Sequence, residues 1–229
     1  MASADVLMGV DVGTTKVAAV IGGRGAAMAI LGAASTPCQG LRRGTVVDVE
    51  ETIRAIAQAV SQAQQMAGVE VDSAWVGVTG QHMACLRTRA ELVLPRAHRT
   101  VTPADIEKVT EAARGSVPVA PDRQLLHVLP RSYWVDDEPR VRNPVGLAAG
   151  RIAVDAHVVT ASRVALENVV RCVEGAGLGV AGLVAEPLAT ATADPATVGP
   201  TAAARWRKSR RCTFAGWFIF AAPSTKRLV

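Results

Sequence analysis

The segment that most constrains the fold lies close to the N-terminus, where an apolar run ends in a short polar turn and a second apolar run follows at once. Val6–Val12 has the pattern of a buried strand, and Val17–Ile21 has the pattern of a strand that returns beside it. The turn between them carries a glycine, two threonines and a lysine. The sequence therefore predicts a β-hairpin with a tight polar turn at the start of the fold.

The residue types around this turn suit a phosphate group. Gly13 allows the backbone to approach an anion closely, and the N–H groups and hydroxyls of Thr14 and Thr15 can donate to phosphate oxygens. Lys16 supplies positive charge, and Asp11 can hold Mg²⁺ through water, because magnesium dehydrates reluctantly. An ordinary hairpin turn is the alternative. The sequence contains no Walker loop, and its glycines after the hairpin lack the spacing of a dinucleotide fingerprint.

Composition limits the class of protein. A chain of 229 residues can hold one large or two small domains, and a hydrophobic content of 49% is ample for a core. The four cysteines are widely separated and form no Cys-x-x-Cys pair, which argues against a zinc site and favours reduced thiols in the cytosol. We expect no signal peptide, and no segment approaches the roughly 18 apolar residues that a membrane span requires.

Charge and aromatic residues are unevenly distributed along the chain. Residues 200–229 contain seven basic residues, no acidic residue and every phenylalanine, whereas the rest of the chain has 18 basic and 20 acidic residues. A slightly acidic body offers no footprint for nucleic acid, so no nucleic-acid partner is expected. The abrupt change of composition predicts a boundary near residue 199.

The first third of the chain after the hairpin has an α/β pattern. Apolar residues recur every three or four positions over Ile53–Ala67, which predicts a helix, and Gly68 is expected to end it. Ala74–Thr79 is then a buried strand. Strands followed by a helix and a strand that returns to the sheet indicate an α/β domain.

The middle third is predicted to form a small α+β unit with its own strands. Thr102 and Pro103 have the pattern of a helix start, and Arg151–Thr160 alternates as a strand. Leu125–Asp136 is predicted as an edge-strand region interrupted by proline. The histidines at positions 82, 127 and 157 are expected at strand ends, as structural residues rather than ligands.

Another helix begins at Ser162, and the strand Leu178–Ala185 follows it. Pro187 suits the first turn of a further helix, so Glu186 is expected at the junction of the strand and that helix. A carboxylate there lies at the positive end of the helix dipole. A catalytic acid and a simple helix cap are both compatible with this position.

Six blocks of sequence carry a resemblance to known families. Gly9–Lys16 resembles the first phosphate loop of the actin, Hsp70 and sugar-kinase superfamily. Five later blocks, in the same order and at similar spacing, resemble the bacterial cell-division family FtsA. They are Gly40–Asp48, Val76–His82, Leu126–Pro130, Asn143–Leu147 and Leu183–Thr190. The resemblance covers about residues 6–194.

This resemblance implies an actin-like, ribonuclease H-like α/β fold. Subdomain 1A would comprise residues 1–83 and 162–198, and the FtsA-specific α+β subdomain 1C, of the SHS2 type, would be inserted at 84–161. Residues 199–229 would be a divergent basic and aromatic tail that is not native to the fold, produced by a frameshift or misassembly. A genuine tail that binds a membrane surface is the alternative.

The resemblance also implies a function and a site. FtsA proteins bind ATP and magnesium, polymerise on the cytoplasmic face of the inner membrane at the division septum, tether FtsZ, and recruit later proteins such as FtsN through subdomain 1C. By resemblance, Asp11 faces the magnesium ion and Gly13–Lys16 form the phosphate loop. Glu186 matches the acid that lies near the attacking water in bacterial actin homologues.

The sequence departs from the family in one major respect. The second actin-like half, with its second phosphate loop, adenosine motif and FtsZ-binding surface, is expected to be missing, as is the amphipathic membrane helix. We therefore predict weak or absent ATP binding, no turnover and a retained interaction surface on subdomain 1C. Another ATPase or kinase of the actin and Hsp70 superfamily, or a non-functional gene fragment, is the alternative.

Overall fold

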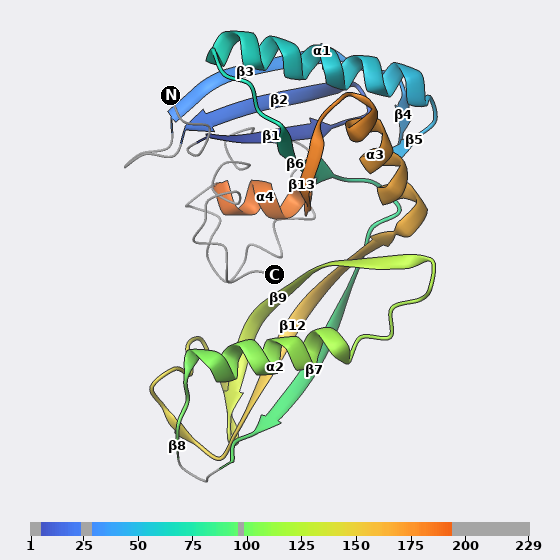
Figure 1. Ribbon diagram of the computed structural model, residues 1–229. Coiled ribbons are helices and arrows are strands. Elements are labelled where there is room, and N and C mark those ends of the chain that lie inside the picture. Colours follow the sequence, from blue (N-terminus) through green and yellow to red (C-terminus); the bar gives the residue numbers. More distant parts are fainter. Residues whose placement is uncertain (1–5, 24–28, 96–98, 194–229) are drawn as a thin grey trace. The chain divides into compact units, whose positions relative to one another are not determined.

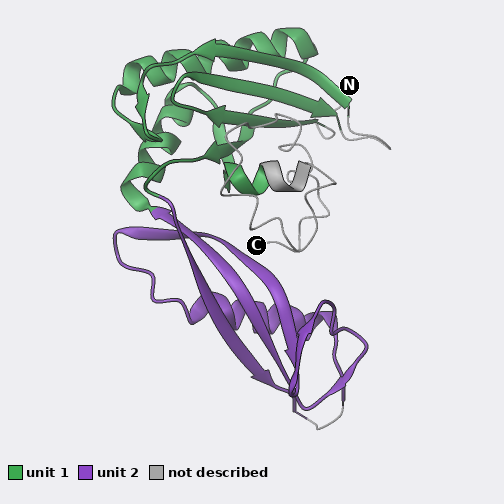
Figure 2. Ribbon diagram, turned by 180° about the vertical axis from the view of Figure 1, so that it is seen from behind, with its two compact units in different colours: residues 1–82, 162–227 green, residues 83–161, 228–229 purple. Residues whose placement is uncertain are grey.

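The computed structural model describes residues 6–23, 29–95 and 99–193, with side chains described as far as residue 189. The chain divides into two compact units (Figure 2). Unit 1 contains the chain up to His82 and resumes at Ser162, and unit 2 contains Met83–Ala161. One unit is therefore inserted into the sequence of the other.

Unit 1 is built on a five-stranded sheet of order β13–β6–β1–β2–β3 (Figure 1). Its strands are β1 (Val6–Val12), β2 (Lys16–Gly23), β3 (Ala29–Pro37), β6 (Ser73–Val78) and β13 (Gly179–Ala185). β1, β2 and β3 pair antiparallel, whereas β1, β6 and β13 run parallel to one another. The carboxyl ends of three parallel strands therefore meet at one edge of the sheet, which is where α/β proteins place their ligands.

The helices of unit 1 pack on this sheet and on each other. α1 (Val49–Ala67) packs against β2 and β3, and α3 (Arg163–Gly175) packs against α1 and β13. The Asp48 side chain caps α1, and Gly68 ends it in the left-handed conformation, with φ of 67°. α4 (Glu186–Ala193) follows β13 directly. Among the described helices, none combines the length and the apolar character needed to cross a membrane.

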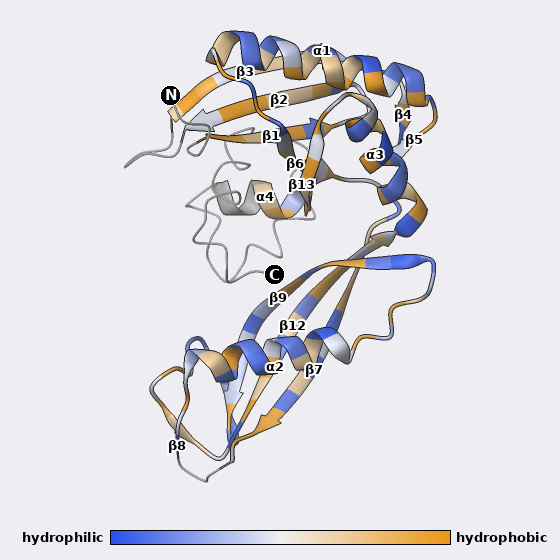
Figure 3. Ribbon diagram, in the orientation of Figure 1, coloured by the Kyte–Doolittle hydropathy of each residue, from blue (hydrophilic) through white to orange (hydrophobic). Residues whose placement is uncertain are grey.

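The core of unit 1 lies along β2, which is apolar over most of its length (Figure 3). Every residue from Val17 to Gly22 is buried. Because successive residues of a strand point to opposite faces, this continuous burial means that both faces of the sheet are covered at β2.

A small second hairpin stands beside the sheet of unit 1. It consists of β4 (Leu41–Arg42) and β5 (Thr45–Val46), joined by Arg43 and Gly44. Both turn residues have positive φ, 56° and 83°. This is the pattern of a two-residue type I′ turn, which matches the twist of paired strands.

Unit 2 is an antiparallel sheet with one long helix. The sheet order is β10–β9–β12–β7, from β7 (Ala84–Val93), β9 (Arg123–Val135), β10 (Glu138–Val141) and β12 (Arg151–Ser162). α2 (Pro103–Gly115) packs against β7 and β9, and the short strands β8 (Arg99–Thr100) and β11 (Ala148–Ala149) pair with each other. The core of unit 2 is aliphatic and includes Val109, Ile152 and Val154, none of which is exposed.

Two expectations for unit 2 are wrong. β9 continues through Pro130 without interruption, although the stretch around Pro130 has no β10 partner and is an edge of the sheet on that side. Proline is accommodated because β10 pairs with β9 only between Tyr133 and Val135, so Pro130 has no donor to supply to β10. His127 lies inside β9 and His157 inside β12, rather than at strand ends.

Candidate functional site

The predicted polar turn joins β1 to β2 in unit 1. The N–H of Gly13 donates to the carbonyl oxygen of Lys16 at 3.1 Å, and a Cβ added to Gly13 would lie 2.9 Å from that same oxygen. Any other residue would therefore displace the turn. Thr14, Thr15 and Lys16 are all exposed, so their donors are available to a bound anion. The N–H of Cys38, just after β3, supports the turn by donating to Thr15 at 3.1 Å.

Two acidic residues that are far apart in the sequence meet at the edge of this sheet. Asp11 lies near the end of β1, opposite Gly77 of β6. Glu186 directly follows Ala185, which lies opposite Val78 of β6. Because the three strands are parallel, Asp11 and Glu186 lie at the same edge, close enough for the charge of Glu186 to raise the pKa of Asp11.

The two carboxylates at this edge both have raised pKa values. Burial raises the pKa of Asp11 to about 7, the negative charge of Glu186 adds to the increase, and Lys16 opposes it. Burial also raises the pKa of Glu186, and a hydrogen bond from the Thr79 hydroxyl opposes that shift. Asp11 can therefore hold or release a proton near neutral pH.

Asp11 carries an additional sign of an incomplete environment. Its Oδ1 atom is buried and has no hydrogen-bond partner among the described residues. A buried acceptor without a partner costs about 1–3 kcal/mol. A cation placed beside Asp11 would relieve this cost and the repulsion from Glu186, so the site fits a magnesium ion whose remaining ligands are water and phosphate. Within the described ranges, no group of three or more His, Cys, Asp or Glu residues is arranged to hold a metal.

One residue of this site was not identified from the sequence. Thr79 comes directly after β6, and its hydroxyl donates to Glu186. A hydroxyl immediately after a buried strand was visible in the sequence. The strand order, which places β6 between β1 and β13, was not visible, and without it nothing links Thr79 to Glu186.

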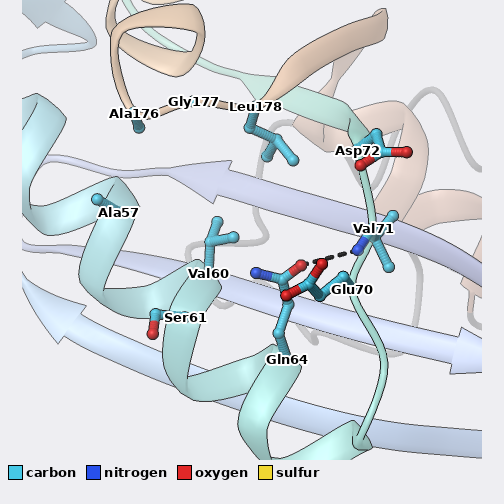
Figure 4. Close-up of a pocket in the computed structure, with 10 residues that line it drawn as sticks. All are labelled: Ala57, Val60, Ser61, Gln64, Glu70, Val71, Asp72, Ala176, Gly177 and Leu178. Carbon is cyan, nitrogen blue, oxygen red and sulfur yellow. Dashed lines mark hydrogen bonds between the residues drawn. The ribbon is translucent and has the colours of Figure 1, made fainter.

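A separate cavity of about 270 Å³ lies elsewhere in unit 1 (Figure 4). Its walls come from α1 and from the segments that precede β6 and β13, including Gln64, Glu70, Asp72 and Leu178. The side chain of Gln64 accepts a hydrogen bond from the N–H of Val71 at 2.8 Å. The cavity therefore lies at the amino ends of β6 and β13, and none of the predicted site residues lines it.

The fold defines the class of protein. The structure resembles a solved structure described as "PilM-PilN type IV pilus biogenesis complex", with a TM-score of 0.52 and 20% sequence identity, over 80% of this chain and 48% of that chain. At this identity the likeness shows the fold alone. The mixed α/β architecture is that of the actin-like fold.

Sequence relatives narrow the class to one family. Residues 80–160 match the family described as "SHS2 domain inserted in FTSA". The chain is 37% identical over 191 residues to the cell division protein FtsA of Pseudomonas aeruginosa and 32% identical over 186 residues to that of Escherichia coli strain K12. These alignments cover 82% and 80% of this chain, and 45% and 44% of the relatives. Over the matched residues the chain belongs to the FtsA family, and it spans less than half the length of these curated relatives.

Proposed function

We propose that the chain acts as a cell-division protein of the FtsA type, and that unit 1 supplies the magnesium and phosphate side of a nucleotide site. The observation that carries this proposal is the buried Oδ1 of Asp11, which lacks a partner among the described residues, beside an exposed turn of anion donors. The relatives that carry the name of cell division protein FtsA support the cellular role.

The residues of the hairpin turn have distinct proposed roles. Asp11 would face Mg²⁺ through water, and Gly13 would let the backbone approach the phosphate. The N–H groups and hydroxyls of Thr14 and Thr15 would donate to phosphate oxygens, and Lys16 would offset their charge. When bound, Mg-ATP supplies a phosphoryl group already polarised by the metal.

Glu186 is proposed to orient a water molecule beside the phosphate and to accept its proton. Its burial raises its pKa, which brings the carboxylate closer to the range of an effective general base. The helix-cap role remains the alternative, because Glu186 is also the first residue of α4. Turnover by this chain alone is expected to be absent.

Calorimetric titration with Mg-ATP tests the nucleotide site. We expect the wild-type chain to bind with a dissociation constant weaker than micromolar, and Asp11→Asn to lose the magnesium dependence. Asp72→Asn is the matched control, because it removes an exposed carboxylate near the amino end of β6, at the opposite edge of the same sheet. Equal, magnesium-dependent binding by Asp11→Asn would exclude the proposed role of Asp11. Binding in the micromolar range or tighter would contradict the predicted weakness.

The cellular role follows from the family. We propose that the chain is located at the division septum, on the cytoplasmic face of the inner membrane, with FtsZ, FtsN and further copies of itself as partners. Unit 2, which overlaps the matched SHS2 region, is the proposed interaction surface. Imaging of a fluorescently tagged full reading frame tests this role. Signal at the septum supports it, and diffuse signal throughout dividing cells contradicts it.

A further inference from the structure

We propose that Thr79 is a positioning residue for Glu186 and that the Arg43–Gly44 turn holds Thr79 in place. This inference rests on the proposed nucleotide site, because it assigns a task to Glu186. It adds a hydroxyl at the end of β6 and a separate hairpin to the residues that shape the site.

The pairing of β6 with β13 sets the two side chains next to each other. Ala185 lies opposite Val78 in a parallel ladder. The next residues along the two strands are Glu186 and Thr79, so the register brings them side by side where the strands end. The Thr79 hydroxyl donates to the Glu186 carboxylate. Asp11, on the strand at the other side of β6, has an Oδ1 that receives no such donor within the described chain.

The main chain at Thr79 is fixed by an unusually close contact with the β4–β5 hairpin. A Cβ added to Gly44, whose φ is 83°, would overlap the carbonyl oxygen of Thr79. A Cβ added to Gly80, whose φ is 148°, would lie 2.7 Å from the carbonyl oxygen of Arg43. The N–H of Gln81 donates to that same oxygen at 3.3 Å. Because Gly44 and Gly80 have no side chains, the two turns pack backbone against backbone. This contact holds the main chain of Thr79 in place.

The contact has a direct chemical consequence for Glu186. A hydroxyl that donates to a carboxylate favours its charged form and restricts its orientation. A carboxylate that orients a water molecule needs this restriction, because small errors of placement in a reacting geometry are costly. Thr79 would supply it without touching the nucleotide or the water, which makes it a positioning residue rather than a catalytic one.

NMR of the full chain without nucleotide tests the inference. The measured quantity is the ¹³C chemical shift of the Glu186 side-chain carboxyl at about pH 7. Thr79→Val keeps the shape of the side chain and removes the hydroxyl, whereas Thr79→Ser keeps the hydroxyl. We expect the Glu186 signal to be displaced in Thr79→Val, because the carboxylate loses its donor, and to stay near the wild-type position in Thr79→Ser. Thr79→Ala replaces Thr79→Val if the valine variant does not fold.

Two further variants complete the test. Thr88→Val removes a hydroxyl from unit 2, where it hydrogen-bonds Ser116, and is expected to leave the Glu186 signal unchanged. Gly44→Asn tolerates positive φ but adds the Cβ that collides with Thr79, so it is expected to move the Glu186 signal. A wild-type Glu186 signal in Thr79→Val, or an equal displacement in Thr79→Ser, overturns the positioning role. A wild-type signal in Gly44→Asn overturns the role of the turn.

The outcome is separable from that of the proposed function. If Mg-ATP fails to bind while the Glu186 signal responds as expected, the nucleotide proposal fails and the link between Thr79 and Glu186 stands. If Mg-ATP binds and Thr79→Val leaves the Glu186 signal in place, the nucleotide site stands and Thr79 has no part in it.

Discussion

Two aspartates with buried carboxylates, one in each unit, have opposite environments. Asp105 of α2 accepts hydrogen bonds from the N–H and the hydroxyl of Thr102, at 2.9 Å and 2.7 Å, and forms an ion pair with Arg99. Burial alone would raise the pKa of Asp105, but these partners hold it at about 2. Asp11 of β1 has a pKa raised to about 7, and its Oδ1 has no partner in the described part of the chain.

The difference separates a structural carboxylate from a candidate functional one. Asp105 receives every donor it needs from its own helix start and the adjacent strand, so its charge serves the stability of unit 2. Asp11 lies near the carboxyl end of β1, at the edge where α/β proteins place their ligands, and its Oδ1 has no hydrogen-bond partner among the described residues. Buried polar groups without a hydrogen-bond partner are rare in folded proteins, and each one needs an explanation, such as a role in catalysis or a bound ion.

The largest expected effect tests the structural half of this comparison. Asp105→Ala removes the capping box of α2 and leaves Arg99 without its carboxylate, so we expect it to lower the free energy of unfolding by about 3 kcal/mol. Urea denaturation of the full chain measures the loss. Glu111→Ala is the control, because Glu111 is 69% exposed and its ion pair with Arg114 is expected to contribute about 0–0.5 kcal/mol. Equal effects of the two variants would contradict the structural role.

Acid is expected to weaken unit 2 through His127. Burial and the nearby Arg114 lower the pKa of His127 from its ordinary value of 6.5 to about 4. The unfolded state binds more protons between these values, so stability is lost as the pH falls from 6.5 toward 4, by about 2 kcal/mol. NMR titration of the His127 imidazole measures the pKa directly. A titration midpoint near 6.5 would show that burial and Arg114 do not lower the pKa of His127, and the expected loss of stability in acid would then be absent.

The unsatisfied environment of Asp11 predicts that a substitution at this position stabilises the protein. Without magnesium, Asp11→Asn removes a buried charge and its repulsion from Glu186, so we expect it to raise the free energy of unfolding by about 1–2 kcal/mol above neutral pH. The folded-state pKa of Asp11, about 7, lies above its ordinary value of 3.8, so the folded protein binds more protons between them. The contribution of Asp11 to wild-type stability therefore falls as the pH rises from about 4 to about 7 and changes little above that.

The gain from Asp11→Asn should accordingly grow between about pH 4 and pH 7 and then level off. Urea denaturation at several pH values measures the gain. Asp72→Asn, at an exposed site of the same unit, is expected to show no such pH dependence. A loss of stability in Asp11→Asn across the whole range would remove Asp11 from the class of functional carboxylates.

The smallest expected effect concerns the metal itself. Millimolar Mg²⁺ is expected to stabilise the wild-type chain by about 1 kcal/mol, because the ion binds the folded state and not the unfolded chain. Thermal denaturation with and without Mg²⁺, at matched ionic strength, measures the shift. Asp11→Asn should show no shift, and an equal shift in both proteins would indicate that magnesium acts elsewhere.

The parts of the structure that follow from local sequence were predictable. The hairpin with Asp11 and Lys16 was predictable because apolar runs on either side of a polar turn specify it within a few residues. Gly68 as the end of α1 was predictable because a glycine after the last apolar position is the usual helix stop.

The parts that depend on which elements become neighbours were not predictable. The link between Thr79 and Glu186 requires β6 to lie beside β13, which is a property of the whole sheet. β9 continues through Pro130 because β10 does not extend that far along it. A proline interrupts strand pairing only where the neighbouring strand needs a backbone N–H from that position. Sequence patterns describe a segment and its own periodicity, and they do not specify the strand at its side.

The way in which unit 2 begins and ends has a consequence for modularity. Ala84 and Thr160, near its two ends, are paired across adjacent strands, and the N–H of Ser162 donates to His82 at 3.3 Å where unit 1 is interrupted. The inserted unit therefore leaves and re-enters its host through neighbouring residues. A short linker from His82 to Ser162 could close unit 1, and a different domain with adjacent termini could replace unit 2 without changing the sheet of its host.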